Sequence, residues 1–411
     1  MHTPTGHVRP SRRPPAMSQD GRVSAATARL PELVPPPTDL PPRVAELRAR
    51  VRAFLAEERA AGSWTPRPDV WLSGWDERFS AELGRRGWLG MTIPAEYGGH
   101  GASPLDRYAV TEELLAAGAP VAAHWIADRQ IAPTLMRFGT EAQRRRYLPG
   151  IAAGAVYFAI GMSEPDAGSD LAAVRTRANR VSDGWELTGT KVWTSGAHHA
   201  HAFFALARSA PRDEGNRHAG LSQFIVELDS PGVQIRPIPL LTGAHHFNEV
   251  VFDRVFVPDE LVLGEIGAGW RQVTSELAFE RSGPERFLST FPLLTAMLGE
   301  LIGASGVARE VGALVTRLWA LRRMSLAIAG ALESGTAPEL AAALVKDLGT
   351  RYENEVIEVA RLLVAIPPDP GAPDGFARLL ADAVLHAPGF TLRGGTNEVL
   401  RGIVARGLGL R

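Results

Sequence analysis

The middle of the chain carries a polar segment rich in small residues, Met162-Ser163-Glu164-Pro165-Asp166-Ala167-Gly168-Ser169-Asp170. The small side chains of Gly168 and Ser169 allow backbone donors to approach a phosphate closely, and the hydroxyl of Ser163 can hydrogen-bond the polar edge of a ring. Taken by itself, the segment is as compatible with a polar turn without function as with a binding site. The sequence on either side is needed to separate the two interpretations.

A second segment follows in the same region, Gly189-Thr190-Lys191-Val192-Trp193-Thr194-Ser195-Gly196. Trp193 offers a flat aromatic face and Ser195 a hydroxyl. A planar ring system held between a tryptophan and short hydroxyl donors is a suitable flavin environment. A core tryptophan on a strand is the alternative interpretation, and it is the favoured one if this segment is considered alone.

Helical periodicity precedes both segments. Apolar residues recur at helical spacing from Val44 to the stop signal at Gly62. Ser103 and Pro104 have the residue types that favour an N-cap and a first helical position. Residues 1–40 mix Pro, Arg, Ser and Thr without periodicity, which is typical of a flexible arm. We therefore expect an arm over residues 1–40 and a helical domain over residues 41–154, with helices near residues 44–62, 77–86, 103–117 and 141–147.

The period changes near residue 155 and changes back near residue 264. Asp183-Gly184 marks a hairpin turn, and alternating or apolar runs separated by Gly and Pro predict a middle β domain over residues 155–263. Helical spacing then resumes and predicts a C-terminal helical domain over residues 264–411, with a last helix from about Glu398. The fold class is α+β. The expected strands cover residues 203–207, 223–228, 233–238 and 250–256; the expected long helices cover residues 305–333 and 338–364, followed by a proline-rich loop at 366–375.

The composition is that of a globular protein and narrows the possible chemistry. The 411 residues are 45% hydrophobic and 22% charged, and the formal net charge of -1 gives no general attraction to nucleic acid or to an anionic membrane. No cysteine is present, which excludes disulfides, thiolate catalysis and cysteine-ligated metal centres. No apolar run approaches the ~20 residues that span a bilayer, and there is no secretory apolar segment. We expect a cytoplasmic protein that binds neither nucleic acid nor membrane.

A group of histidines invites a metal-site interpretation. Adjacent histidines on a strand point to opposite faces, and no Asp, Glu or His at ligand spacing accompanies them. We therefore expect surface or interface histidines and no metal. The group comprises His198, His199, His201, His245 and His246.

At their spacing, and within a helical, β, helical plan, the two polar segments resemble those of the acyl-CoA dehydrogenase family. The resemblance covers roughly Pro42 to the C-terminus and implies a β-barrel-like middle domain between two helical domains. In that family both segments line FAD, and the serine matching Ser169 also lies near the pantetheine of the thioester. The resemblance implies FAD contacts from Met162, Ser163, Gly168, Ser169, Trp193 and Ser195.

A C-terminal segment extends the resemblance. Arg393-Gly394-Gly395-Thr396-Asn397-Glu398 is similar to the family's Gly-Thr-x-Glu/Gln segment. The family pattern implies that Thr396, Asn397 and Glu398 contact the cofactor and that Gly394 and Gly395 lie at the substrate. From the residues alone, the two glycines are a flexible approach to a helix for which Thr396 is the N-cap. Both interpretations can hold, because a helix N-terminus is also an anion site.

The catalytic base is where the sequence departs from many members of the family. These members carry a glutamate immediately before the Gly-Thr pair, where this chain has Gly394, which cannot accept a proton. Other members, such as the isovaleryl and long-chain enzymes, carry the base in a Glu-Arg pair on the first helix after the β domain. Here that pair is Glu280-Arg281, so the resemblance implies that Glu280 is the base and that Arg281 lies at the cofactor or thioester. A carboxylate beside an aromatic residue and a flavin is desolvated, which raises its pKa.

Two alternatives to this base stay open. Glu280 and Arg281 can instead form a surface charge pair, and Glu285 is a weaker base candidate, since five further residues of helix place it on another face. With Glu280 as base, the α-proton of an acyl-CoA goes to Glu280 and the β-hydride to flavin N5. The family pattern further implies that the thioester carbonyl is polarised by a flavin hydroxyl and by the backbone amide of Gly394.

The usual family contacts to the FAD of a neighbouring subunit are not visible in this sequence. Residues 307–313 replace one conserved stretch of the family pattern, and the proline-rich loop with residues 376–386 replaces another. Similar departures from the family pattern occur in the hetero-oligomeric acyl-CoA dehydrogenases of steroid side-chain breakdown. The run from Trp193 to His198 also resembles the sequence of that branch. We therefore expect a homo- or hetero-oligomer in which an unlike chain completes FAD binding, with electron-transfer flavoprotein as the acceptor that the family implies.

Two other functions remain open from the sequence. The chain can be a partner subunit that completes the FAD site of another chain. It can also be a flavin oxygenase or an acyl-carrier-protein dehydrogenase on the same scaffold. The sequence does not determine the acyl group, so short, branched, long and steroid acyl chains all remain candidates.

Overall fold

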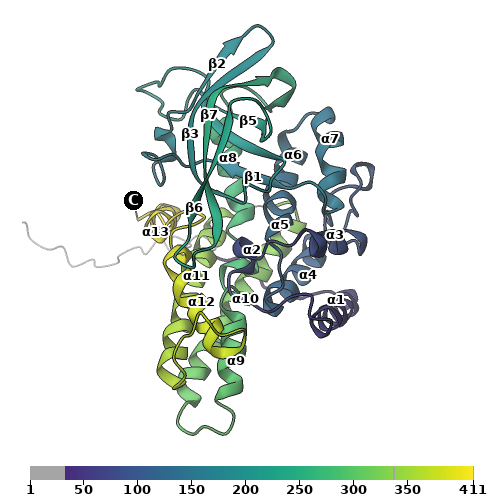
Figure 1. The fold of residues 1–411 in the computed structure, drawn as a ribbon, viewed down its shortest axis with the longest axis vertical. Helices are drawn as coiled ribbons and strands as arrows, with labels where there is room; N and C mark the ends of the chain where they lie inside the picture. The colour runs from purple at the N-terminus through teal and green to yellow at the C-terminus, as the bar shows by residue number, and fades with distance from the viewer. Residues whose placement is uncertain (1–32, 337, 411) are drawn as a thin grey trace, which may run out of the picture.

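The computed structural model describes residues 33–336 and 338–410, and for residues 276–280 it describes the backbone without the side chains. Predictions for residues 1–32 lie outside this range. The described chain is helical at first, forms a β-sheet in its middle and is helical again to its end (Figure 1). This order confirms the α+β class and the helical, β, helical plan.

Local capping signals set the helix ends in the N-terminal part. Ser103 accepts a hydrogen bond from the Asp106 N–H at 3.1 Å, and Asp106 accepts one from the Ser103 N–H at 3.4 Å, so that the two residues form a capping box. Thr140 and Gln143 form a second box. A π-helical turn, Ala127–Ile131, joins two of the helices. The helices are α1 (Pro42–Ala60), α2 (Val70–Ser73), α3 (Glu77–Arg85), α4 (Pro104–Ala117), α5 (Ala122–Ile126), α6 (Ala132–Phe138) and α7 (Glu141–Ala152).

The strands form an eight-stranded sheet with the order β6-β7-β3-β2-β4-β5-β8, and β1 pairs in parallel with β4. The predicted hairpin at Asp183-Gly184 joins β2 to β3, which are antiparallel. The strand predicted over residues 250–256 is longer, because it begins at His245 and pairs with both β3 and β6. The strands are β1 (Phe158–Gly161), β2 (Arg177–Val181), β3 (Gly184–Ser195), β4 (Ala202–Arg208), β5 (Leu221–Glu227), β6 (Val233–Pro239), β7 (His245–Pro258) and β8 (Val262–Leu263).

The C-terminal helices form a bundle that projects away from the sheet (Figure 1). A helix that the sequence analysis did not assign, α12, begins directly after the proline-rich loop and tolerates Pro388 near its end. A 3-10 turn, Pro284–Arg286, follows the first helix of this part. The helices are α8 (Gly269–Glu280), α9 (Phe291–Glu300), α10 (Ala308–Glu333), α11 (Glu339–Leu363), α12 (Gly375–Phe390) and α13 (Asn397–Gly407).

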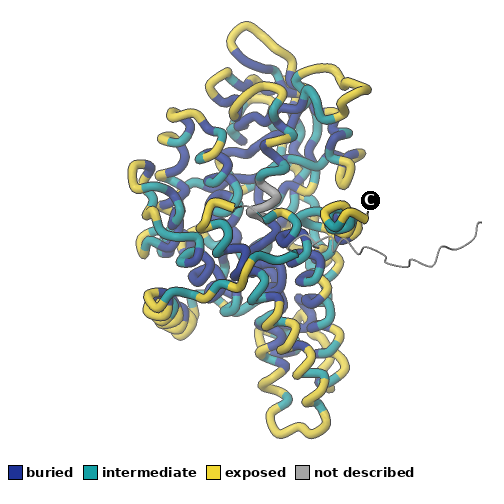
Figure 2. Tube along the Cα trace, turned by 180° about the vertical axis from the view of Figure 1, so that it is seen from behind, coloured by how far each residue is buried: buried dark blue, intermediate teal, exposed yellow. Residues whose placement is uncertain are grey.

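Two apolar cores fix these parts to one another. One core joins α1, α3 and α4 to the C-terminal bundle and includes Phe54, Phe79 and Leu293. The other core joins the sheet to α6 and α7 and includes Phe203 and Phe224. Buried positions concentrate where these elements meet, while the end of the projecting bundle is exposed (Figure 2). Burial of this kind is the main favourable contribution to folding.

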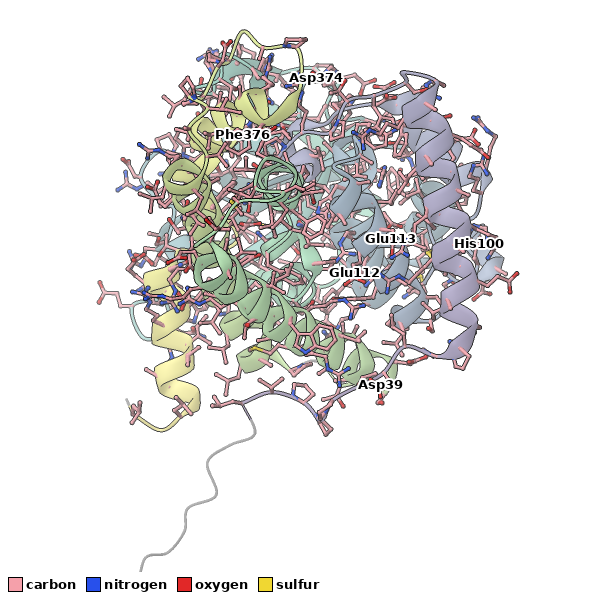
Figure 3. All side chains as sticks on the ribbon, turned by 90° about the horizontal axis from the view of Figure 1, so that it is seen from below. Asp39, His100, Glu112, Glu113, Asp374 and Phe376 are labelled. Atoms are coloured by element: carbon pink, nitrogen blue, oxygen red, sulfur yellow. The ribbon has the colours of Figure 1, made fainter. Side chains whose placement is uncertain are left out.

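Two glutamates of α4 bond this helix to α1 and to α10 of the C-terminal part. Arg52 Nε donates to Glu113 at 2.7 Å, and Arg322 Nε donates to Glu112 at 2.6 Å. Figure 3 shows Glu112 and Glu113 between α1 and the C-terminal helices. Near the end of the expected arm, the exposed Asp39 pairs with Arg323 of α10 at 2.8 Å.

Candidate active site

The two polar segments of the sequence meet in space at the start of the sheet. The Val192 N–H donates to the Ser163 carbonyl at 2.9 Å. Beside this contact, the ammonium of Lys191 lies 2.8 Å from Glu164 and is fully buried. Glu164 also accepts hydrogen bonds from the backbone N–H groups of Arg175, at 2.6 Å, and Thr176, at 2.9 Å. One buried ion pair therefore fixes both segments relative to each other.

The protonation of this pair follows from its surroundings. Burial alone would raise the pKa of Glu164, but the charge and hydrogen bond of Lys191 outweigh it and the pKa lies below its usual value. Burial lowers the pKa of Lys191 to about 8, against the opposing charge of Glu164. The sequence analysis did not single out either residue for this role, although an acidic first segment and a lysine in the second segment were the available signal.

The first segment presents its small residues outward. Glu164 and Ala167 exchange backbone hydrogen bonds at 2.9 and 3.1 Å, which closes a tight turn and exposes Gly168 and Ser169. A Cβ at Gly168 would meet nothing within 4 Å, so the packing of the described residues does not require glycine there. Open space in front of a glycine suits the close approach of a ligand. Met162 and Ser163 are half-buried at the root of the turn.

Trp193 stands out from the second segment. Its φ of 60° lies in the left-handed region, at an irregularity of β3 between Lys191 and Thr194. Its side chain is 59% exposed and touches the edge of Phe247, with ring centroids 5.9 Å apart. A bulky residue in this backbone region is strained and is held there by its surroundings. The alternative of a core tryptophan is therefore wrong, while Ser195 is half-buried at the end of the strand.

The buried side chain of Lys346 holds the C-terminal segment in place. Thr396 is the N-cap of α13, as predicted, and accepts from the Val399 N–H at 3.4 Å. Asn397 is 2% exposed, and its Oδ1 accepts from Lys346 Nζ at 3.0 Å. Lys346 also donates to the Gly395 carbonyl at 2.8 Å. The Asn397 side chain thus points into the protein, whereas Glu398 is exposed. Lys346 was not recognised from the sequence.

The end of α8 meets the C-terminal segment. Arg281 is 9% exposed, and its Nε donates to the Gly394 carbonyl at 3.1 Å. Gly394 and Gly395 have φ values of 65° and 87°, which only glycine adopts without strain. A Cβ at Gly395 would lie 3.1 Å from the Arg281 guanidinium. The side chain of Glu280 lies outside the described side chains, and the next residue, Arg281, links the end of α8 to Gly394 through its guanidinium.

A buried polar network continues from Gly394 through Arg393. The Arg393 guanidinium lies 2.6 Å from Asp69, which itself lies 3.2 Å from His386, and it covers the ring of Trp71 at 4.4 Å. Glu353 is fully buried 4.0 Å from Arg393, and burial raises the pKa of Glu353 to about 7. The network joins the N-terminal helices to α11 and α12, and it fixes the approach to Gly394.

Two expectations about other residues need correction. Glu285 does not lie on another face of α8, because that helix ends at Glu280 and Glu285 belongs to the 3-10 turn that follows. It is 2% exposed and lies 3.4 Å from Arg129, so it is committed to an ion pair. His246 was expected at the surface or an interface, yet it is 8% exposed within this chain, and burial lowers its pKa to about 4.

The exposed ring of Trp193, the open space before Gly168 and the half-buried hydroxyls of Ser163 and Ser195 fit a flat cofactor that also carries phosphate. These are the features expected for FAD. In the described part of the chain, no helix is long and apolar enough to cross a membrane.

Family models for the acyl-CoA dehydrogenase N-terminal, middle and C-terminal domains match residues 42–155, 159–255 and 295–409. The chain therefore belongs to the acyl-CoA dehydrogenase family, whose members are FAD-dependent oxidoreductases. Acyl-CoA dehydrogenase IpdE1 of Mycobacterium tuberculosis is 37% identical over 387 residues, which cover 89% of this chain and 98% of the relative. Acyl-CoA dehydrogenase FadE34 of the same organism is 34% identical over 89% of this chain and 48% of its own length.

Solved structures agree with these relatives. The Tcur3481-Tcur3483 steroid ACAD superposes with a TM-score of 0.78 and 32% identity, over 91% of this chain and 99% of that chain. The ChsE4-ChsE5 complex from Mycobacterium tuberculosis superposes with a TM-score of 0.77 and 29% identity, over 90% and 98%. The expected family is thus confirmed, together with its likeness to the steroid enzymes.

Proposed function

We propose that this chain catalyses the α,β-dehydrogenation of an acyl-CoA thioester, with Glu280 accepting the α-proton. Bound FAD supplies the acceptor for the β-hydride. The observation that carries the proposal is the 3.1 Å hydrogen bond from Arg281 to the Gly394 carbonyl. This contact between the end of α8 and the Gly394 position supports the proposal that a carboxylate at 280 serves the same thioester as a base at the Gly394 position does in other family members.

The chain's own groups suit the remaining tasks. Arg281 donates to the Gly394 carbonyl and Asp69 anchors the Arg393 side chain, which restrains the backbone around Gly394. A fixed backbone N–H at Gly394 can donate to the thioester carbonyl as negative charge develops there. Ser163, Ser195 and Trp193 are proposed to hold the flavin, with Met162, Gly168 and Ser169 beside them. Thr396, Asn397 and Glu398 are proposed at the N-terminus of α13, where a helix favours anionic groups.

Anaerobic mixing of the FAD-loaded protein with acyl-CoA thioesters tests this function. We expect the flavin absorbance to bleach with the wild type and the rate to fall about 10²- to 10⁴-fold in Glu280→Gln, which is the usual contribution of a general base. Glu265→Gln is a matched control, because Glu265 is an exposed residue just before α8. An unchanged rate in Glu280→Gln would remove Glu280 from the mechanism.

We further propose that an unlike acyl-CoA dehydrogenase chain completes the FAD site. The solved relatives whose names join two chains support this, as does the exposure of Trp193 and of Leu392, which is 61% exposed beside the C-terminal segment. Co-expression with candidate partner chains, followed by measurement of bound FAD per protein, tests the idea. If the chain alone binds one FAD and oxidises an acyl-CoA, the partner requirement is wrong. Electron-transfer flavoprotein is the proposed acceptor, and oxygen consumption with a hydroxylated product would instead identify an oxygenase.

A further inference from the structure

A small pocket lies between α4 and the segment that follows α8. It has a volume of about 20 Å³, which is room for one water-sized group. Arg107 and Tyr108 of α4 line one side, and Ser282 and Gly283 line the other. Ser325 and Ala329 of α10 close it from below. Pocket and site share one short stretch of chain, since Ser282 directly follows Arg281.

Three polar side chains that line the pocket, those of Tyr108, Arg129 and Ser325, are hydrogen-bonded within the protein. Arg129 donates to Thr111 at 3.2 Å and to Glu285 at 3.4 Å. Ser325 donates to the Ser282 carbonyl at 2.6 Å, and Tyr108 donates to Glu112 at 3.4 Å. Among the side chains that the structure describes, the guanidinium of Arg107 has no hydrogen bond or ion pair. Its N–H donors are therefore available to an acceptor in the pocket, and the residue as a whole is half-buried.

The charges around Arg107 do not neutralise it fully. Burial, followed by the like charge of Arg129, lowers the pKa of Arg107 to about 10, against the opposing charges of Asp128 and Glu285. Glu285 is already engaged by Arg129, and Asp128 accepts from the Gly90 N–H at 2.8 Å. A guanidinium without an acceptor is costly to bury. An acceptor oxygen in this pocket would offset that cost.

Ser282 in the pocket wall lies close to Glu280, the proposed base, because the two residues are two positions apart in the sequence. Consecutive Cα atoms lie 3.8 Å apart, so the Cα of Ser282 is at most about 8 Å from that of Glu280. The backbone at Gly283 lies close to the side chains of Arg129 and Glu285. A Cβ at Gly283 would lie 2.5 Å from the Arg129 guanidinium and 2.0 Å from Glu285. Glycine at 283 is thus needed for the pocket wall. The backbone of the pocket wall at Ser282 therefore lies near the backbone of Glu280.

We propose that Arg107 binds an acceptor oxygen at the far end of the acyl group, so that the substrates are acyl-CoA thioesters carrying a distal ketone or carboxylate. This inference rests on the proposed function and names its substrate class. Arg107 then determines specificity without taking part in proton or hydride transfer. A site that leaves a half-buried charged donor unpaired disfavours the analogue without the oxygen, because the apolar chain cannot supply the acceptor.

Three thioesters of equal chain length test the proposal: hexanoyl-CoA, 5-oxohexanoyl-CoA and adipoyl-CoA. We expect kcat/KM of the wild type to be about 10- to 100-fold higher for at least one oxygen-bearing substrate than for hexanoyl-CoA. Arg107→Leu should remove this preference while changing hexanoyl-CoA turnover by less than about threefold. Preference for adipoyl-CoA assigns a carboxylate, and preference for 5-oxohexanoyl-CoA assigns a ketone.

Controls separate this proposal from the proposed function. Arg50→Leu, at an exposed arginine of α1, should leave the preference intact. Calorimetric binding of the three thioesters to Glu280→Gln measures the preference without turnover. If no thioester bleaches the flavin but binding still depends on Arg107, the proposed function fails and the pocket assignment stands. The assignment would be overturned if the wild type had the same kcat/KM for all three thioesters. It would also be overturned if Arg107→Leu lowered kcat/KM equally for all three.

Discussion

Exchange of Glu164 for Gln is expected to be among the most damaging single changes near the site. It leaves the fully buried ammonium of Lys191 with neutral acceptors, the Met162 carbonyl at 3.2 Å and the amide oxygen of the new side chain, and without an opposing charge. Removing one partner of a buried ion pair typically costs about 3–5 kcal/mol, because the other charge stays desolvated. We expect a loss of this size in the free energy of unfolding at neutral pH.

The converse exchange, Lys191→Met, should cost less. Glu164 keeps two backbone N–H donors, from Arg175 and Thr176, so its charge is still partly compensated. We expect a loss of about 1–3 kcal/mol. The double variant Glu164→Gln/Lys191→Met removes both charges, and it should be more stable than the sum of the single losses predicts by about 2 kcal/mol or more.

Chemical unfolding of the four proteins, followed by circular dichroism, gives this double-mutant cycle. The pH dependence supplies a second check with a defined sign. Because the pKa of Glu164 is depressed in the folded protein, its contribution is present above the ordinary value of 4.5 and is lost as the pH falls. The difference between wild type and Glu164→Gln should therefore shrink in acid. A coupling energy near zero would refute the claim that this pair fixes the two segments.

Three further outcomes are expected. Trp193→Ala should change stability by less than about 0.5 kcal/mol, since the side chain is 59% exposed, but should raise the FAD dissociation constant about 3- to 10-fold in a fluorescence titration. Burial raises the pKa of Glu353 to about 7, so its protonation stabilises the fold in acid and this contribution is lost as the pH rises through 7. In Glu353→Gln, the melting temperature should therefore depend less on pH between pH 5 and 8. In a Glu280→Gln background, Gly394→Glu should partly restore flavin bleaching. The backbone φ of 65° at residue 394 makes this exchange cost about 1–2 kcal/mol of stability. No recovery of bleaching would argue that residues 280 and 394 do not serve the same thioester position.

Much of the fold is legible in local sequence signals. The α4 helix begins and ends as Ser103, Pro104 and Gly118 indicate, since capping depends on residues only a few positions apart. The hairpin at Asp183-Gly184 is local in the same way. By contrast, α12 carries a proline and follows a proline-rich loop, and it is held as a helix by packing against its neighbours. Tertiary packing outweighed local preference there.

The candidate site shows the same division. Motif resemblance singled out the two polar segments and local residue types predicted the Thr396 cap, but neither could reveal contacts between residues far apart in sequence. Lys191 pairs with Glu164, and Arg281 reaches Gly394, only because the fold brings distant segments together. The left-handed backbone of Trp193 likewise depends on its buried neighbours on β3. No spacing rule within one segment predicts these features.

Exchange of the α-hydrogen of an acyl-CoA with solvent deuterium tests the role of Glu280 most directly, because it reports proton removal separately from hydride transfer. Mass spectrometry of the recovered thioester should show deuterium incorporation with the wild-type protein and about 10²- to 10⁴-fold slower incorporation with Glu280→Gln. Incorporation at the same rate in both proteins would contradict the assignment of the base.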